Sequence, residues 1–377
     1  MSRPSPVLFL CLFASQSAML VLSPILPELA RELGVSVATA GQLRSVSGLV
    51  GGVTAVTVAL LPRRPGLRDL LALGAALITA ASLLSAAAPT FAVLALAQAV
   101  VGAGVGLLVA VGIAASGEWA QPHRRAHVLA WAIAGMPAAW IAGMPVVGLV
   151  SQAGWRMTFL AVPAVAGLAA LALVLRRPAD TSSRRATLRL DVARFTIGEL
   201  LANAAWASVL VYAGALLLES YPVTAPVVAF GLGLTAAAML PGTFTARRVK
   251  PTAPLLAALT AYQGGAVAVL GAVRPGVAFT LAVLASMAFV NGLRSMVASA
   301  FGMDTAPDDK LAVMAMRAAA NQFGYLLGAA AGGLALALGG FPALGGALAT
   351  LFAASLAVMS APAAWRRERW TQSRSPA

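Results

Sequence analysis

Two ionisable side chains stand inside otherwise apolar runs of the sequence, and their types suit ion or proton binding. Glu199 and Arg294 each lie about 10–12 Å from one end of a predicted membrane-crossing helix. Asn203 follows one helical turn after Glu199, and Asn291 lies about one turn from Arg294. Because charged groups inside a bilayer are expensive, we expect these four side chains to form a polar patch, with Glu199 paired to Arg294 and binding a cation or exchanging a proton. The alternative is that Arg294 extends to the membrane surface while Glu199 is solvated or bonded to backbone.

Polar and aromatic residues in the other apolar runs extend the set of candidates. Amide side chains inside a membrane either bind a solute or form interhelical hydrogen bonds, which contribute about 0.6 kcal/mol each. Tryptophan rings at the same depth could stack an aromatic solute. The further candidates for a central solute site are Gln16, Gln98, Trp131, Trp140, Trp206, Asn321 and Gln322.

The composition identifies the environment of these residues. Of 377 residues, 60% are hydrophobic and 10% are charged, against about 25% charged in an ordinary soluble domain. A soluble core of this size cannot hide so much apolar surface, so we expect much of it to face lipid. The net charge of +14 does not indicate a nucleic-acid partner, because the cations fall in short breaks between apolar runs. A single cysteine, Cys11, excludes an internal disulfide framework.

The apolar runs predict an all-α polytopic protein. A helix needs roughly 20 apolar residues to cross about 30 Å of hydrocarbon, and the sequence supplies about twelve such runs. They cover 6–29, 37–61, 69–88, 90–115, 127–150, 156–175, 192–216, 222–245, 252–273, 276–300, 311–337 and 341–362.

Cations in alternate connections predict the orientation. Most of the 26 Lys and Arg residues fall on the side of the N-terminus, and the positive-inside rule places that side in the cytoplasm. Lys310 and Arg317 are counted there, whereas Arg31, Arg44, Arg156 and Arg274 are assigned to the other side. We therefore expect a multi-pass protein of the plasma, or inner, membrane with both termini in the cytoplasm.

A polar stretch divides the chain into two halves. We expect a six-helix bundle over 1–175, a cytoplasmic linker over 176–191, a second six-helix bundle over 192–362 and a cytoplasmic tail over 363–377. Paired bundles of this kind are typical of transporters whose solute site lies between the halves, near the middle of the membrane.

Two segments resemble a known family. The run PILPELARELGVSVATAGQL, from Pro24, resembles the first external loop of drug-efflux and sugar-efflux members of the major facilitator superfamily. The stretch GMPAAWIAGMPVVGLVSQAGWRMTF, from Gly135, resembles the fifth-span signature of that group and the entry to its sixth span. The resemblance implies the major facilitator fold, with the spans of Glu199 and Arg294 lining a central cavity. It also implies a glycine-proline hinge at Gly135, Gly143, Pro145 and Gly148.

The same resemblance implies cytoplasmic gate loops, from which this sequence departs. Arg64, Gly66 and Arg68 match the loop after the second span, but Ala59 and Arg63 replace its first glycine and its aspartate. In the second half Gly242 and Arg247 match, while Ala246 replaces the acid. In the fourth span Gln98 occupies the place of an arginine that is common in proton-coupled relatives, and a neutral amide cannot tune a carboxylate as a guanidinium does. An acid-anchored gate and proton antiport through that motif are therefore unsupported.

These observations favour a secondary transporter that is not an enzyme. An apolar cavity with few fixed charges suits a small lipophilic or weakly polar solute, and the family resemblance favours efflux by alternating access. Protons are a candidate coupling ion, no metal or cofactor is expected, and the chain is expected to be monomeric. The alternatives are a transporter-like sensor or inactive relative, and an integral-membrane prenyl transferase. The latter needs two acidic clusters, whereas only one is found, formed by Asp304, Asp308 and Asp309.

Overall fold

A computed structural model gives the arrangement of the chain. It describes residues 4–35, 37–61, 63–180, 183–184, 190–223, 225–305 and 309–360. Within these ranges the secondary structure is almost entirely helical, as the apolar runs predicted, and nine helices are long and apolar enough to cross a membrane.

The described residues of the first half form eight α-helices. They are α1 (Pro4–Leu20), α2 (Leu22–Glu32), α3 (Val37–Leu60), α4 (Leu67–Ala86), α5 (Phe91–Glu118), α6 (Arg125–Val150), α7 (Trp155–Phe159) and α8 (Val165–Leu175). Short elements join them: β1 (Arg63–Arg64), the 3-10 turns η1 (Pro122–Arg124) and η2 (Ser151–Ala153), and the π-helical turn η3 (Leu160–Ala164).

Six α-helices are described in the second half. They are α9 (Leu190–Ser220), α10 (Ala225–Ala237), α11 (Met239–Thr245), α12 (Ala253–Ala272), α13 (Val277–Thr305) and α14 (Lys310–Ser360), together with β2 (Ser183–Arg184) and the 3-10 turn η4 (Ala246–Arg248). Strand β2 pairs antiparallel with β1, so Ser183 and Arg184 of the linker lie against the connection between α3 and α4.

These helices account for twelve crossings. The pairs α1/α2 and α10/α11 and the run α7–η3–α8 each form one broken crossing, and α14 forms two. It changes direction at Gly339 and Gly340, where the backbone is not helical. Gly340 has φ of 63°, a value that side chains with a Cβ rarely adopt. The predicted break between 311–337 and 341–362 is confirmed there.

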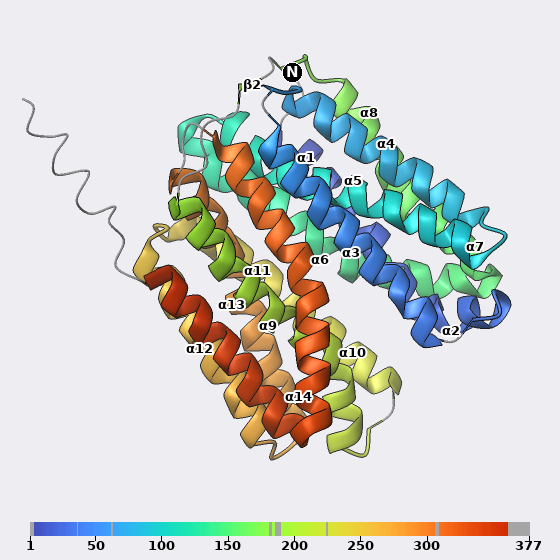
Figure 1. Cartoon of the computed structure of the whole chain (residues 1–377), viewed down its shortest axis with the longest axis vertical. Coiled ribbons are helices and arrows are strands. Elements are labelled where there is room, and N and C mark those ends of the chain that lie inside the picture. Colours follow the sequence, from blue (N-terminus) through green and yellow to red (C-terminus); the bar gives the residue numbers. More distant parts are fainter. Residues whose placement is uncertain are drawn as a thin grey trace, which may run out of the picture.

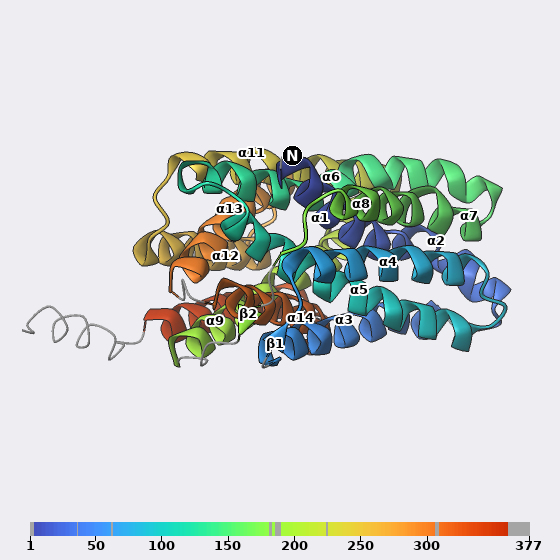
Figure 2. The same ribbon diagram turned by 90° about the horizontal axis from the view of Figure 1, so that it is seen from above.

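The two halves diverge from one end of the molecule. We call this the basic end; it carries the start of α1, β1, η1, η4 and the start of α14, and the other is the distal end. From the basic end the helices of the first half and those of the second half run apart (Figure 1). Seen from above, α14 lies beside α3 and α11 lies beside α6, so two seams join the halves (Figure 2).

Glycines set the closest helix contacts. A Cβ on Gly135 of α6 would lie 2.2 Å from the carbonyl oxygen of Phe9 in α1, and one on Gly242 would lie 1.9 Å from that of Phe289 in α13. Only glycine permits these crossings. The sequence prediction placed Gly242 in a gate loop; the structure places it inside α11, in a helix contact.

A carboxylate clamp fixes the distal end of the first half. The Trp155 indole Nε1 donates a 2.6 Å hydrogen bond to Glu32, and Arg156 forms a salt bridge with the same carboxylate. Hydrogen bonds from Arg156 and Trp155 hold the pKa of Glu32 below its usual range. The clamp therefore stabilises the fold above the ordinary pKa of a glutamate, and this contribution is lost as the pH falls through the lowered pKa.

This linkage gives a pH-dependent prediction. The thermal unfolding midpoint of the wild type, followed by tryptophan fluorescence, is expected to fall as the pH is lowered below about 4, and Glu32→Gln should lose part of that dependence. Glu28→Gln, one turn earlier on α2, is the matched control and should keep the wild-type profile. Identical pH profiles for all three proteins would show that the clamp contributes nothing.

Candidate functional site

A buried charge cluster joins four helices of the second half. Arg294 of α13 donates from Nη2 to Oε1 of Glu199 in α9 at 2.5 Å, and from Nε to Thr260 of α12 at 3.0 Å. Arg317 of α14 donates from Nε to the other carboxylate oxygen of Glu199 at 2.8 Å. The side chains of Glu199, Arg294 and Arg317 are 0%, 2% and 9% exposed. The predicted ion pair is therefore present, as part of a larger cluster.

Arg317 is a correction to the sequence interpretation, which counted it among the cytoplasmic loop cations. Helix α14 begins at Lys310, so Arg317 lies about two turns inside it. Its Nη2 also contacts Ser295 of α13. A pattern read along the sequence does not show that a third helix brings a second guanidinium to the same carboxylate, and this residue was missed for that reason.

The two asparagines of the predicted patch form no part of the charge cluster and have other contacts. Asn291 accepts a 3.3 Å hydrogen bond from Gln263 of α12 and is buried. Asn203 is half-buried on α9 and packed against Gly324 of α14, and its amide nitrogen has no hydrogen-bond partner among the described residues. The charge cluster thus lies in the interior of the second half, and the cavity-lining role of these residues stays a prediction.

The other predicted solute residues are distributed among several contacts. Gln16 of α1 accepts a 3.5 Å hydrogen bond from Trp140 of α6, and Gln98 of α5 donates to Ser85 of α4 at 3.2 Å. Trp206 is half-buried against the core of the second half. Asn321 is half-buried on α14. Gln322 is 2% exposed, and its side-chain oxygen accepts no hydrogen bond from the part of the chain that the structure describes. The structure therefore does not gather these residues into one site.

Two polar contacts join the halves at the basic end, one between α14 and α5 and one between η4 and α6. Lys310 of α14 binds Glu118 of α5 at 2.8 Å. Arg247 of η4 donates to Nδ1 of His127 in α6 at 2.9 Å. Because a guanidinium is only a donor, His127 must accept through an unprotonated Nδ1. These polar contacts hold the two halves together at one end.

An aromatic pair adds to the contact between α6 and α11. The ring of Trp131 in α6 packs edge-on against Phe244 of α11, with centroids 5.3 Å apart. Trp131, predicted to stack a solute, therefore contacts the other half of the protein in this conformation. Arg247 lies over the Phe244 ring at 5.0 Å, which links the aromatic and polar contacts.

The second seam lies between α3 and α14. Gly51 and Gly52 of α3 pack against Gln322 and Phe323 of α14. Two turns toward the distal end, Arg44 lies over the ring of Tyr325 at 5.6 Å and donates to the carbonyl of Met19. Arg44 was assigned to the external side. The structure instead places it inside α3, between the halves and half-buried.

The residues of the predicted hinge differ in their surroundings. Gly135 makes the tight contact with α1 described above, and a Cβ on Gly143 would lie 3.2 Å from Leu20. Pro145 lies inside α6 and is exposed, and Gly148 has open space around it. The close contact between α6 and α1 explains why Gly135 is a glycine. A hinge role for these four residues stays a prediction.

An acid from the linker meets the first gate loop. The carboxylate of Asp180 accepts a 2.9 Å hydrogen bond from the backbone N–H of Arg68 and a 3.3 Å bond from the Trp119 indole. A Cβ on Gly66 would lie 2.7 Å from the Asp180 carbonyl oxygen, so this glycine makes room for the linker. Arg64 lies in β1, paired with Ser183. Sequence reasoning missed Asp180 because it looked for the acid within the loop itself.

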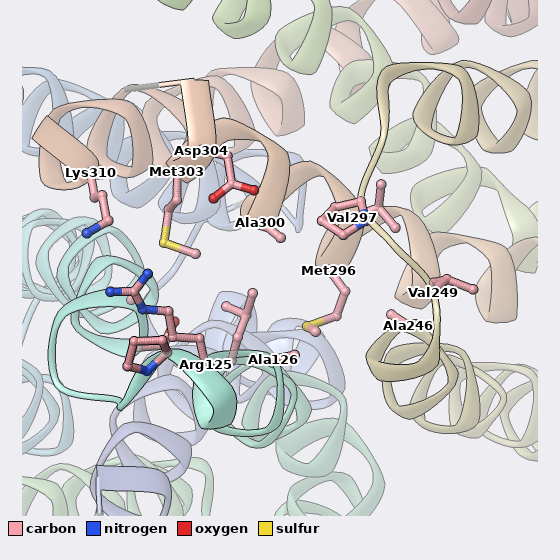
Figure 3. A pocket seen from close by; sticks show the side chains of 15 residues that line it. Arg125, Ala126, Ala246, Val249, Met296, Val297, Ala300, Met303, Asp304 and Lys310 are labelled. Atoms are coloured by element: carbon pink, nitrogen blue, oxygen red, sulfur yellow. The ribbon is translucent and has the colours of Figure 1, made fainter. Parts of the chain in front are cut away.

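A pocket of about 210 Å³ opens between the halves at the basic end (Figure 3). Lys310 and Arg125 lie together at one side of it, and Ala246 with Val249 lie at the opposite side. Most of its surface is apolar. The lining residues are Ser116, Gly117, Pro122, Arg125, Ala126, Leu129, Ala246, Val249, Pro251, Met296, Val297, Ala300, Met303, Asp304 and Lys310.

The sequence of this chain is similar to those of known proteins. The sequence model of the Major Facilitator Superfamily matches residues 8–262. A protein of Escherichia coli O157:H7 described as inner membrane transport protein YdhP is 27% identical over 358 residues, which cover 89% of this chain and 90% of that protein. The chloramphenicol resistance protein of Streptomyces lividans is 28% identical over 210 residues, 53% of each chain.

A solved structure shares the fold. The proton:xylose symporter XylE, bound to 6-bromo-6-deoxy-D-glucose, matches with a TM-score of 0.79 and 13% identity, over 95% of this chain and 94% of that chain. At this identity the likeness concerns the arrangement of helices and not the solute.

Proposed function

The chain belongs to the major facilitator superfamily of membrane transporters, and from that premise we propose that it exports a small lipophilic or weakly polar solute by alternating access. The observation that carries the proposal is the asymmetry of the contacts between its halves. Salt-bridge, hydrogen-bond and aromatic contacts join them at the basic end, while the helices run apart toward the distal end (Figure 1). Two rigid bundles that are closed at one end can rock about the seams, so that the space between them becomes accessible first from one side of the membrane and then from the other.

We place the basic end in the cytoplasm. The positive-inside rule supports this orientation, since the connections at that end carry most of the cations. In this orientation the structure corresponds to an outward-facing conformation, closed on the cytoplasmic side. The pairs Glu118–Lys310 and His127–Arg247 are then the contacts that must break before solute can enter from the cytoplasm.

The charges inside the membrane support a solute without multiple charges. Glu199, Arg294 and Arg317 bind one another within the second half, so they are occupied structurally. Two guanidinium groups stabilise the ionised carboxylate, which argues against proton exchange at Glu199 in this conformation. Arg44, over the ring of Tyr325 between the halves, is the better candidate to contact solute, because a cation inside a membrane helix marks a functional position.

Flux through reconstituted vesicles tests the proposal. Radiolabelled chloramphenicol is the first probe, because one relative is a chloramphenicol resistance protein. We expect protein-dependent flux, and its measurement with and without an imposed proton gradient tests whether protons are the coupling ion. The absence of protein-dependent flux for a panel of lipophilic and weakly polar solutes would contradict export and favour a sensor or inactive relative.

A charge exchange distinguishes a moving gate from a static contact. Glu118→Lys places two cations together at the closed end and is expected to change flux several-fold, by about 1 kcal/mol of like-charge repulsion. The double variant Glu118→Lys with Lys310→Glu restores an opposite pair and should recover wild-type flux. Equal flux in all three proteins would show that this seam does not open during transport.

A further inference from the structure

The pocket at the basic end combines an apolar wall with a charged rim. Helix α13 contributes Met296, Ala300 and Met303, which share one face because they are spaced four and three residues apart. Methionine side chains are flexible and polarizable, so such a wall adapts to ligands of different shape. Helix α6 contributes Leu129 and Ala126 from the other half of the protein.

The rim carries an unpaired cation. Arg125 lines the pocket, is exposed, and has no carboxylate partner among the residues that the structure describes. Lys310 lies at the same side of the pocket (Figure 3) but is bound by Glu118. Asp304, the acid of the lining, is exposed and lies on α13. Arg125 is therefore the group that is available to an incoming ligand.

The surroundings strengthen the positive character of this rim. Basic residues in and beside η1, α6, η4 and the start of α14 outnumber the three described carboxylates, Glu118, Asp304 and Asp309. The cations are Arg124, Arg125, Arg247, Arg248, Lys250 and Lys310. Clustered like charges around a low-dielectric hollow attract and concentrate small anions.

The size of the pocket limits the ligand to a narrow one. Its volume of about 210 Å³ is below the roughly 300–1,000 Å³ of pockets that hold drug-sized molecules. One acyl chain or one ring fits this space, with its charged end at Arg125. A branched or multi-ring solute does not.

We propose that this pocket is a binding site for an acidic amphiphile, a single acyl chain or ring that ends in a carboxylate or phosphate. The apolar part lies against Met296, Ala300 and Leu129, and the acidic group binds Arg125. The ligand contacts both halves, so it binds the conformation in which the basic end is closed and stabilises that conformation. Bound ligand therefore slows transport by holding the two halves together.

Binding of decanoate to the full chain in phosphatidylcholine nanodiscs tests the site. Radiolabelled decanoate is titrated onto wild type, Arg125→Gln and Ala300→Trp, with empty nanodiscs subtracted. Loss of a charged hydrogen bond should weaken binding about tenfold in Arg125→Gln, and the indole should abolish it by filling the pocket in Ala300→Trp. Arg176→Gln changes an exposed cation at the end of α8 that belongs neither to the lining nor to the rim, and should bind like wild type.

Two competition measurements determine which chemical group the pocket binds. Decanol has the same chain without the charge and should compete at least about tenfold more weakly. Competition by phosphatidylglycerol added to the nanodiscs would identify a lipid headgroup as the source of the acid, and its absence would identify a free acid. Equal binding of decanol, or unchanged decanoate binding in both Arg125→Gln and a folded Ala300→Trp, would overturn the proposal. The measurement needs no transport, so its failure is separate from failure of the export proposal.

Discussion

Replacement of Glu199 by glutamine is expected to give the largest loss of stability of any single change in the second half. The carboxylate is fully buried and accepts from both Arg294 and Arg317. Its removal leaves two guanidinium groups close together in a medium without water to solvate them. In buried ion pairs, loss of one partner costs about 3–5 kcal/mol. The thermal unfolding midpoint in detergent, followed by tryptophan fluorescence, should fall accordingly.

A second substitution tests whether the loss of stability comes from the unbalanced charge of the cluster or from the lost contacts of Glu199. Arg317→Gln in the Glu199→Gln background restores the net charge of the cluster, so the double variant should be more stable than Glu199→Gln alone. Glu219→Gln, at an exposed position near the other end of α9, is the matched control and should leave the midpoint unchanged. A Glu199→Gln protein as stable as this control would show that the cluster does not hold the second half together.

The cluster also shows what a sequence can and cannot supply. The length of the apolar runs fixed where the helices lie, and the depth of Glu199 and Arg294 in their runs predicted that they meet. The predicted run 311–337 contains Arg317, but the sequence interpretation counted it with Lys310 among the cytoplasmic loop cations and did not pair it with Glu199. Partners on a third helix depend on packing angles, which hydrophobic periodicity does not determine.

The same limit applies to the solute residues. Polar side chains inside apolar runs were treated alike, yet Gln98 bonds to Ser85 inside the first half and Gln322 lies at the seam with α3. Which face of a helix points to its own bundle and which points to the other half follows from tertiary arrangement. The fold was therefore predictable in more detail than the candidate site.

The gate loop illustrates how a missing residue is supplied from elsewhere. The family resemblance implied an aspartate where this chain has Arg63, and the sequence interpretation concluded that an acid-anchored gate was unsupported. In the structure Asp180 brings a carboxylate to the start of α4 from the linker. There it accepts from a backbone N–H of the first helical turn, where an anion also interacts favourably with the helix dipole. It also accepts from Trp119, adjacent to the inter-half pair of Glu118 with Lys310.

Removal of this carboxylate is expected to release the linker. Asp180→Ala loses two hydrogen bonds to a charged acceptor, each contributing about 1.5–3 kcal/mol, and with them the contact that holds β2 against β1. Trypsin should then cleave the linker, which contains Arg184 and Arg185, at least about tenfold faster, because cleavage follows the population of the open segment.

The matched control is Asp69→Ala, which removes an exposed acid from the first turn of α4. Asp69 pairs with Arg68 at 3.5 Å and has no hydrogen bond or ion pair to the described part of the linker. This variant should leave the cleavage rate unchanged. If the linker carries the anchor that the loop lacks, Asp180→Ala should also change flux while Asp69→Ala does not. Equal cleavage of the two variants would mean that the linker is held by its strand pairing and that Asp180 is dispensable. Faster cleavage without a change in flux would confine its role to tethering.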